Sequence, residues 1–180
     1  MGGFRQVDER EVWRGHVVTV VEGTFEAPDG ERFEREVVRH PGAVSVVAVE
    51  DGSAVLVRQY RAAIDRLLLE IPAGKVDADD GDPESTAHRE LAEEVGLRAG
   101  RLTRLCEFFN TPGFCDEHAH VFLAEDLSSV GTDLQGVEEQ HMTVERVPLA
   151  DVPARIAAGD IVDAKTIIGL LLARERLGVR

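Results

Sequence analysis

Cysteine is scarce in this chain, which has two among its 180 residues, Cys106 and Cys115. Two cysteines are too few for the disulfide framework that stabilises small secreted proteins, so we expect a reducing compartment, the cytoplasm. No apolar run approaches the 18 residues or so that a membrane-spanning helix needs, and the first residues lack the features of a signal peptide. We therefore expect neither export nor a membrane span.

Basic residues are also few, because 20 lysines and arginines stand against 34 aspartates and glutamates, for a formal net charge of −14. This charge disfavours non-specific binding to nucleic-acid backbones or anionic membranes, and we expect neither as a partner. It also repels an anionic small molecule, so a site for one would need bound cations or local arginines. With 43% hydrophobic and 30% charged residues, the composition is typical of a single globular domain with a sizeable core.

The most informative stretch runs from Glu70 to Leu97. Pro72 interrupts a strand-like run, and Asp82 and Pro83 restart the chain as a helix, because aspartate is a good N-cap and proline fits the first helical position. Gly96 follows the last periodic residues, as is typical of a helix end. The pattern therefore predicts a strand, a bend and a helix.

Acidic residues gather on one side of this helix. Glu90 and Glu94 are four residues apart and so lie one above the other, with Glu93 beside them. One interpretation is a solvated acidic face, which needs no function. The alternative is a cation site, because carboxylates that converge with a backbone carbonyl beside a glycine-rich bend are the oxygen ligands that Mg²⁺ or Mn²⁺ prefers.

The stretch from Gly74 to Leu97 resembles the Nudix box, Gly-x5-Glu-x7-Arg-Glu-U-x-Glu-Glu-x-Gly-U, where U is aliphatic. Its second half matches throughout, at Arg89, Glu90, Leu91, Glu93, Glu94, Gly96 and Leu97. Its first half departs, because Gly74 lies 15 residues before Arg89, one more than in the pattern. Gly81 or Asp80 stands where the pattern has glutamate. We interpret the departure as a loop insertion of one residue.

The rest of the chain has the patterns of strands and helices. Residues 1–10 are polar, and we expect them to be loosely held. Apolar, β-branched or alternating runs predict strands within 11–27 and at 32–40, 43–49, 54–60, 67–71, 102–109, 118–124 and 142–147, and helical periodicity marks 149–158 and 164–177. This order predicts an α/β fold with a mixed sheet.

The resemblance implies the Nudix fold, an α/β/α sandwich with a mixed β-sheet, preceded by an N-terminal antiparallel β-hairpin or sheet. We therefore divide the chain at Pro41–Gly42 into an N-terminal β region, residues 1–41, and a Nudix domain, residues 42–180. The resemblance also implies that the N-terminal strands pair with a second subunit in a homodimer. A hairpin packed on its own domain is the alternative.

Motifs outside the box are similar to those of the ADP-ribose pyrophosphatase branch of the family. They lie on the strand around Arg35, in residues 58–61 and 69–74, in the loop at 111–117 and at the pair Glu138–Glu139. The resemblance implies hydrolysis of ADP-ribose to AMP and ribose 5-phosphate. It implies substrate contacts from Arg35, Glu36, Arg61, Glu70, Gly74, Gly113, Phe114 and Glu117. Either arginine could instead be an ordinary strand arginine.

The resemblance also implies about two or three Mg²⁺ or Mn²⁺ ions per site. Glu90, Glu94 and the Ala73 carbonyl would hold them, with Glu93 shared between metal binding and catalysis. The base that activates water comes from a later loop in this branch, where Glu139 matches best and Glu138 stands next to it. Both could also be ordinary loop acids.

Two alternatives stay open for the activity. One is hydrolysis of another nucleoside diphosphate sugar, such as GDP-mannose, or of another nucleotide. The other is a sensor that binds ADP-ribose without cleaving it, which the intact box glutamates disfavour. The six histidines are not at metal-ligand spacings, and we expect His118 and His120 to be structural or surface residues on one side of a strand.

Overall fold

The computed structural model of the chain describes residues 3–76, 81–134 and 137–180. It divides into two compact units. The first consists of Met1–Gly42 together with Phe108–His118, and the second of Ala43–Glu107 and Ala119–Arg180.

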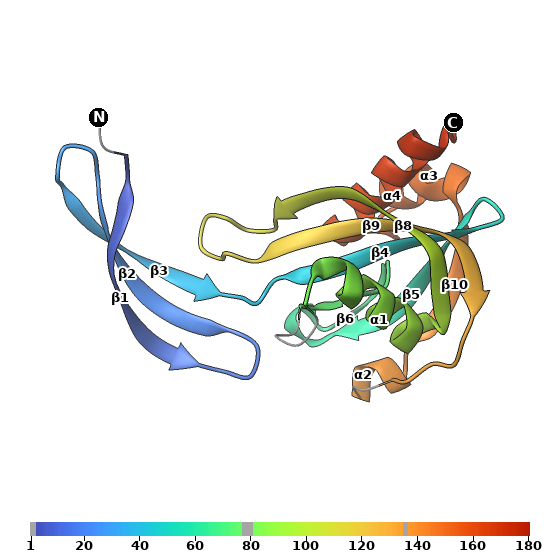
Figure 1. Cartoon of the computed structure of the whole chain (residues 1–180), viewed down its shortest axis with the longest axis horizontal. Helices are drawn as coiled ribbons and strands as arrows, with labels where there is room; N and C mark the ends of the chain where they lie inside the picture. Colours follow the sequence, from blue (N-terminus) through green and yellow to red (C-terminus); the bar gives the residue numbers. More distant parts are fainter. Residues whose placement is uncertain (1–2, 77–80, 135–136) are drawn as a thin grey trace. The chain divides into compact units, whose positions relative to one another are not determined.

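The first unit is built on an antiparallel three-stranded sheet in the order β1 (Arg5–Arg14), β2 (Thr19–Glu26) and β3 (Arg32–Arg39) (Figure 1). The N-terminal sheet is thus confirmed, but the expectation that residues 1–10 are loosely held is wrong for residues 5–10. Arg5 pairs with Glu26 at 2.7 Å and Arg10 with Glu22 at 3.0 Å across β1 and β2. Paired strands with charged partners do not produce the apolar pattern used to predict strands.

The second unit contains a mixed sheet in the order β10-β5-β4-β9-β8, with β6 added beside β5 and β7 beside β4 (Figure 1). Its strands are β4 (Ala43–Glu50), β5 (Ser53–Arg61), β6 (Arg66–Glu70), β7 (Ala73–Lys75), β8 (Leu97–Phe109), β9 (His118–Ser129) and β10 (Thr143–Pro148). β4 is parallel to β9 and antiparallel to β5 and β7. The predicted mixed sheet is therefore confirmed.

Helices cover both faces of this sheet. α1 (Pro83–Val95) packs Ala87 and Leu91 into the cluster that contains Val46 of β4. α4 (Ala164–Leu177) packs on the other face, where a Cβ at Gly169 would lie 3.0 Å from Val47. Neighbouring residues of a strand point to opposite faces of the sheet, so alternate side chains of β4 pack against α1 and against α4. The result is the predicted α/β/α sandwich.

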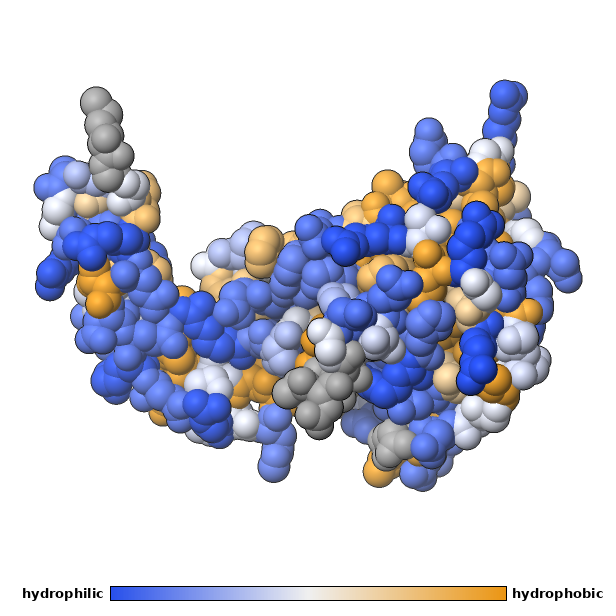
Figure 2. All heavy atoms as spheres, in the orientation of Figure 1, coloured by the Kyte–Doolittle hydropathy of each residue, from blue (hydrophilic) through white to orange (hydrophobic). Residues whose placement is uncertain are grey.

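The remaining helical segments are short. They are η1 (Ala62–Ile64), α2 (Val137–Gln140), η2 (Leu149–Asp151) and α3 (Val152–Ala157). Within the described ranges, no helix has the length and apolar character needed to cross a membrane. Hydrophilic residues dominate the face of each unit drawn in Figure 2, with hydrophobic residues in smaller areas between them. This surface fits a chain in which 30% of the residues are charged.

Candidate functional site

α1 begins and ends where the sequence predicts. Asp82 is its N-cap and accepts a hydrogen bond from the Ser85 N–H at 2.8 Å, and Gly96 ends it with a φ of 65°. Gly81, just before the cap, has a φ of 77°, a value that favours glycine. Asp80, the other candidate for the midbox position, lies outside the described residues.

Two acids of α1 point into the protein and not into solvent. Glu90 is 8% exposed and Glu94 is 5% exposed. The Ala73 N–H of β7 donates a hydrogen bond of 3.0 Å to Glu94 Oε2. For these two acids the interpretation as a solvated face is therefore wrong, and they form a buried pair beside the bend that precedes the helix.

Gly74 gives Glu90 the room that it occupies. A Cβ atom at position 74 would lie 1.9 Å from Glu90 Oε1 and 2.0 Å from its Cδ. Any side chain there would displace the Glu90 carboxylate. This steric requirement explains a glycine at the start of the box, independently of any contact with substrate.

Arg89 holds the outer part of the acidic cluster. Its guanidinium donates to Glu90 Oε1 at 2.7 Å, to Glu93 Oε2 at 3.0 Å and to the Lys75 carbonyl at 3.3 Å. Glu93 is more exposed than the other two acids, with 24% of its side chain accessible. The four-residue spacing of Arg89 and Glu93 thus forms the ion pair that it predicts.

The buried acids resist ionisation. Burial, together with the charge of Glu90, raises the pKa of Glu94 to about 8. Burial also raises the pKa of Glu90 to about 7, although the charge of Arg89 lowers it. Two buried carboxylates that repel one another are stabilised in their charged form by a cation. Their oxygen donors fit a hard divalent ion such as Mg²⁺ or Mn²⁺.

Arg61 and Glu70 bind one another. Arg61 Nε donates to both Glu70 oxygens, at 2.9 and 3.1 Å, and its Nη2 donates to Oε2 at 2.5 Å. Glu70 is 1% exposed. These hydrogen bonds hold the pKa of Arg61 above its ordinary value, with a further contribution from the charge of Glu94. The structure thus pairs the two predicted substrate residues with one another and places Arg61 within electrostatic reach of Glu94.

Glu138 and Glu139 lie on α2 and face different neighbours. The charge of Glu139 contributes to the raised pKa of both Glu90 and Glu94, so this carboxylate lies within electrostatic reach of the buried pair. The charge of Glu138 instead contributes to the raised pKa of Tyr60. Glu138 is exposed and Glu139 is half-buried. Of the two, Glu139 is the one whose charge acts on the buried acids.

The first unit contains a pocket of about 340 Å³ between β3 and the segment at 108–118. Four predicted substrate residues line it, namely Arg35, Glu36, Gly113 and Phe114. Val37, Pro112, Cys115 and Asp116 of the same two motifs also line it, whereas the sequence did not indicate its remaining walls, which are Phe25, Arg39 and Phe109. Glu117 is not among the residues that line it. Backbone hydrogen bonds from Val38 N–H to the Phe114 carbonyl at 2.8 Å and from Asp116 N–H to the Val38 carbonyl at 3.1 Å hold the segment to β3.

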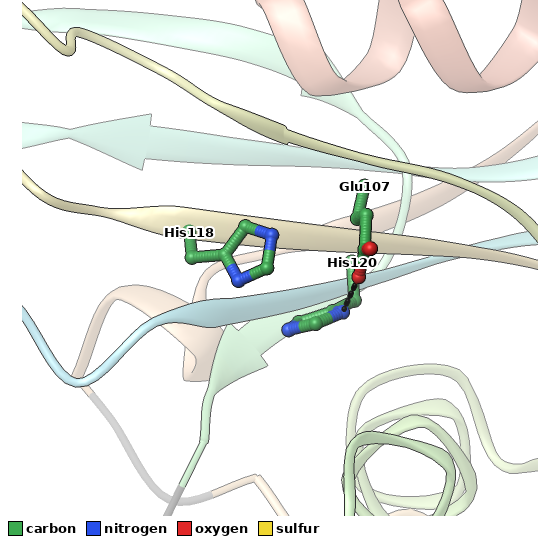
Figure 3. A group of neighbouring side chains, drawn as sticks. All are labelled: Glu107, His118 and His120. Carbon is green, nitrogen blue, oxygen red and sulfur yellow. Dashed lines mark ion pairs between the residues drawn. The ribbon is translucent and has the colours of Figure 1, made fainter. Parts of the chain in front are cut away.

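The histidines of β9 have partners that their spacing did not indicate. Figure 3 shows His120 beside Glu107 of β8, with Nδ1 at 3.3 Å from Glu107 Oε2. Within the first unit, His118 stacks on Phe109 with ring centroids 4.8 Å apart. These pairs depend on which strands are neighbours in the sheet, and the amino-acid sequence alone does not specify the strand order.

The sandwich and its paired buried acids define an α/β/α protein with a carboxylate cluster whose oxygen donors fit a divalent cation. Residues 38–167 match the family model of the NUDIX domain. The chain belongs to the Nudix family, as its box predicted. A solved structure of an ADP compounds hydrolase superposes with a TM-score of 0.85 at 26% identity, covering 99% of this chain and 96% of that one.

Relatives cover most of the chain. It is 39% identical to the ADP-ribose pyrophosphatase of Bacillus subtilis (strain 168), over 90% of this chain and 88% of the relative. It is 38% identical to the ADP-ribose pyrophosphatase of Mycobacterium tuberculosis (strain ATCC 25618 / H37Rv), over 93% and 82% respectively. The GDP-mannose pyrophosphatase of Cronobacter sakazakii (strain ATCC BAA-894) is 34% identical over 78% of each chain.

Proposed function

We propose that this protein hydrolyses the diphosphate linkage of ADP-ribose, giving AMP and ribose 5-phosphate. The buried pair Glu90 and Glu94, beside a third acid on α2, is the observation that carries the proposal, because it fits a cation-dependent hydrolase. Two ADP-ribose pyrophosphatases at 38 and 39% identity over nine-tenths or more of the chain support the substrate.

Glu90, Glu94 and the Ala73 carbonyl would hold Mg²⁺ or Mn²⁺, with Glu93 at the edge of the site, and we propose about two or three ions. When bound, they would supply Lewis-acid stabilisation to the phosphate oxygens. Hydrogen bonds within the protein orient these carboxylates. The Ala73 N–H donates to one Glu94 oxygen at 3.0 Å, and Arg89 donates to Glu90 and Glu93.

We assign the general base to Glu139. Its carboxylate accepts a proton from water as the water oxygen forms a bond to phosphorus, and the bond from phosphorus to the bridging oxygen breaks. The electrostatic reach from Glu139 to both buried acids supports this choice over Glu138. Glu93 remains a second candidate for a catalytic role at the edge of the site.

Substrate recognition is proposed for the predicted residues outside the box. Arg35, Glu36, Gly113 and Phe114 share one pocket. Arg35 would be its cation for an anionic ligand, because the other arginine of the lining, Arg39, is paired with Glu9 and Asp116. Arg61, paired with Glu70, lies within electrostatic reach of Glu94. Glu117, and Gly74 at the start of the box, complete the proposed set.

We further propose a homodimer formed through the N-terminal strands. β1 is largely exposed, including Val12 at 54% and Trp13 at 56%. Large exposed apolar side chains on a strand favour pairing with another chain. We propose the cytoplasm as its compartment, which two free thiols support, and neither nucleic acid nor membrane as a partner. Light scattering behind size exclusion tests the dimer, since a monomer at micromolar concentration would contradict it.

A substrate panel tests the activity. ADP-ribose, GDP-mannose and other nucleoside diphosphate sugars are compared with Mg²⁺ and with Mn²⁺, and kcat/KM is measured for each. We expect ADP-ribose to give the highest value. GDP-mannose is the second candidate because of its 34% identical relative. Tight binding of ADP-ribose without turnover at either metal would instead indicate a sensor.

A further inference from the structure

Between β6 and β7 the chain changes its partner strand. Glu70 of β6 pairs with Val57 of β5, whereas Ala73 of β7 pairs with Ser45 of β4. Ile71 and Pro72 lie between these two pairings, in neither strand. Buried backbone groups at a point where the chain changes its partner strand still need hydrogen-bond partners. Proline has no N–H, so the donor to be satisfied there is the Ile71 N–H.

A side chain of α4 satisfies that donor. The Ile71 N–H donates to Thr166 Oγ1 at 3.0 Å, and both residues are 0% exposed. The Thr166 hydroxyl in turn donates to Asp163 Oδ2 at 2.7 Å, and the same oxygen accepts the Thr166 N–H at 2.9 Å as the N-cap of α4. The hydroxyl thus has one acceptor and one donor, both fixed.

The other hydrogen bonds of residues 71–73 connect this segment to β4 and to Glu94. The Pro72 carbonyl accepts from the Val46 N–H at 2.8 Å, and the next N–H, that of Ala73, donates to Glu94 Oε2 at 3.0 Å. α4 also approaches closely, since a Cβ at Gly169 would lie 3.1 Å from Ile71 Cδ1. Only Pro72 therefore separates the residue that donates to Thr166 from the residue that donates to Glu94.

We propose that Thr166 is a positioning residue of the cation site, acting through Ile71 and Ala73 on the Glu94 carboxylate. The inference rests on the proposed function, in which Glu94 and the Ala73 carbonyl hold the metal. Without the hydroxyl, the buried Ile71 N–H has no acceptor. We expect the backbone of residues 71–73 to shift until this N–H reaches another acceptor. The Ala73 N–H and carbonyl then move together, because they belong to adjoining peptide groups. Partners that orient a metal ligand in this way typically contribute about 10- to 100-fold in metal affinity.

Thr166→Val tests the proposal, because it removes the hydroxyl and keeps the shape. Mn²⁺ binding to the substrate-free protein is measured by electron paramagnetic resonance, and steady-state kinetics are measured with ADP-ribose at saturating metal. We expect Thr166→Val to weaken Mn²⁺ binding by about 10-fold and to lower kcat more than it raises KM. Thr166→Ser, which keeps the hydroxyl, should restore both values.

Leu170→Val is the matched control, because it trims a fully buried side chain of the same helix that has no polar group. It should lower the melting temperature and leave the Mn²⁺ Kd unchanged. If Thr166→Val does not fold, Thr166→Ala removes the same hydroxyl with less bulk. An unchanged Kd in the hydroxyl-free variant, or an equal change in Leu170→Val, would overturn the proposal.

Glu94→Gln separates this inference from the proposed function. If Glu94→Gln loses Mn²⁺ while Thr166→Val does not, the cation site stands and the positioning role is wrong. If the unmodified protein does not bind Mn²⁺, or if Glu94→Gln binds it equally well, the cation site itself is wrong and the positioning role fails with it.

Discussion

The acids of α1 and those of α2 differ in how the fold holds them. Glu90 and Glu94 are buried on a helix of 13 residues, and backbone or arginine donors fix their oxygens. Glu138 and Glu139 lie on a helix of four residues without a buried side chain. The first pair is placed by the core, whereas the second pair is placed by a short surface element.

This difference separates two requirements of the proposed chemistry. A cation site needs several oxygens at fixed positions, which a buried helix provides before any ligand binds. A base needs one carboxylate at the attacking water, and a surface element can bring it there when substrate binds. Variants of the first pair should therefore lose cation binding, whereas variants of the second pair should lose catalytic rate and keep cation binding.

The largest effect is expected for Glu94→Gln. The amide keeps the shape but removes a charged ligand, and loss of several kcal/mol of charge stabilisation corresponds to a fall of about 10³-fold or more in kcat/KM. The metal-free protein should become more stable at pH 8, because a buried carboxylate is replaced by a neutral group. Activity assays and thermal melts measure the two effects. Full activity with Mg²⁺ would remove Glu94 from the cation site.

The next effect is expected for Glu139→Gln, which should lower kcat by about 10²- to 10⁴-fold, the range for a general base. Mn²⁺ binding and the melting temperature should change little, because the side chain is not buried in the core. Glu138→Gln is the matched control and should stay near the activity of the unmodified enzyme. The reverse result, with Glu138→Gln inactive, would exchange the roles of the pair.

The same contrast explains what the sequence could predict. The caps of α1, its acidic face and the apolar run of β4 are local patterns, and the structure confirms them. The charged strand at 5–14, the Arg61–Glu70 pair and the hydrogen bond from Ile71 to Thr166 join distant parts of the chain or lack an apolar pattern. They depend on which strands and helices become neighbours, and a single sequence does not specify that locally.

A smaller effect is expected for Gly74→Ala, which tests how tightly the bend packs on α1. The added Cβ would meet Glu90 Oε1 at 1.9 Å, so the carboxylate must move. We expect Mn²⁺ affinity to fall by about 10-fold, with a folded protein by circular dichroism. Gly131→Ala is the control, because a Cβ there meets no atom within 4 Å. Equal affinities in the two variants would show that Glu90 tolerates displacement.

The last contrast concerns the pH dependence of stability. The pKa values of Glu90 and Glu94 are raised to about 7 and 8 from the ordinary 4.5, so between these values the folded state retains protons that the unfolded state has released. The free energy of unfolding of the metal-free protein should therefore fall as pH rises from about 4.5 to 8, by on the order of a few kcal/mol.

Mg²⁺ should oppose this loss, because it binds the ionised acids. The rise in melting temperature on adding Mg²⁺ should accordingly be larger at pH 8 than at pH 6, by a few degrees. Melts of Glu94→Gln at the same two pH values provide the comparison, and they should show a smaller difference. Glu138→Gln should retain the full difference, because its carboxylate lies on α2 and contributes to the pKa of Tyr60 instead. An equal response to Mg²⁺ at both pH values would mean that the buried acids of α1 are not the groups that bind the ion.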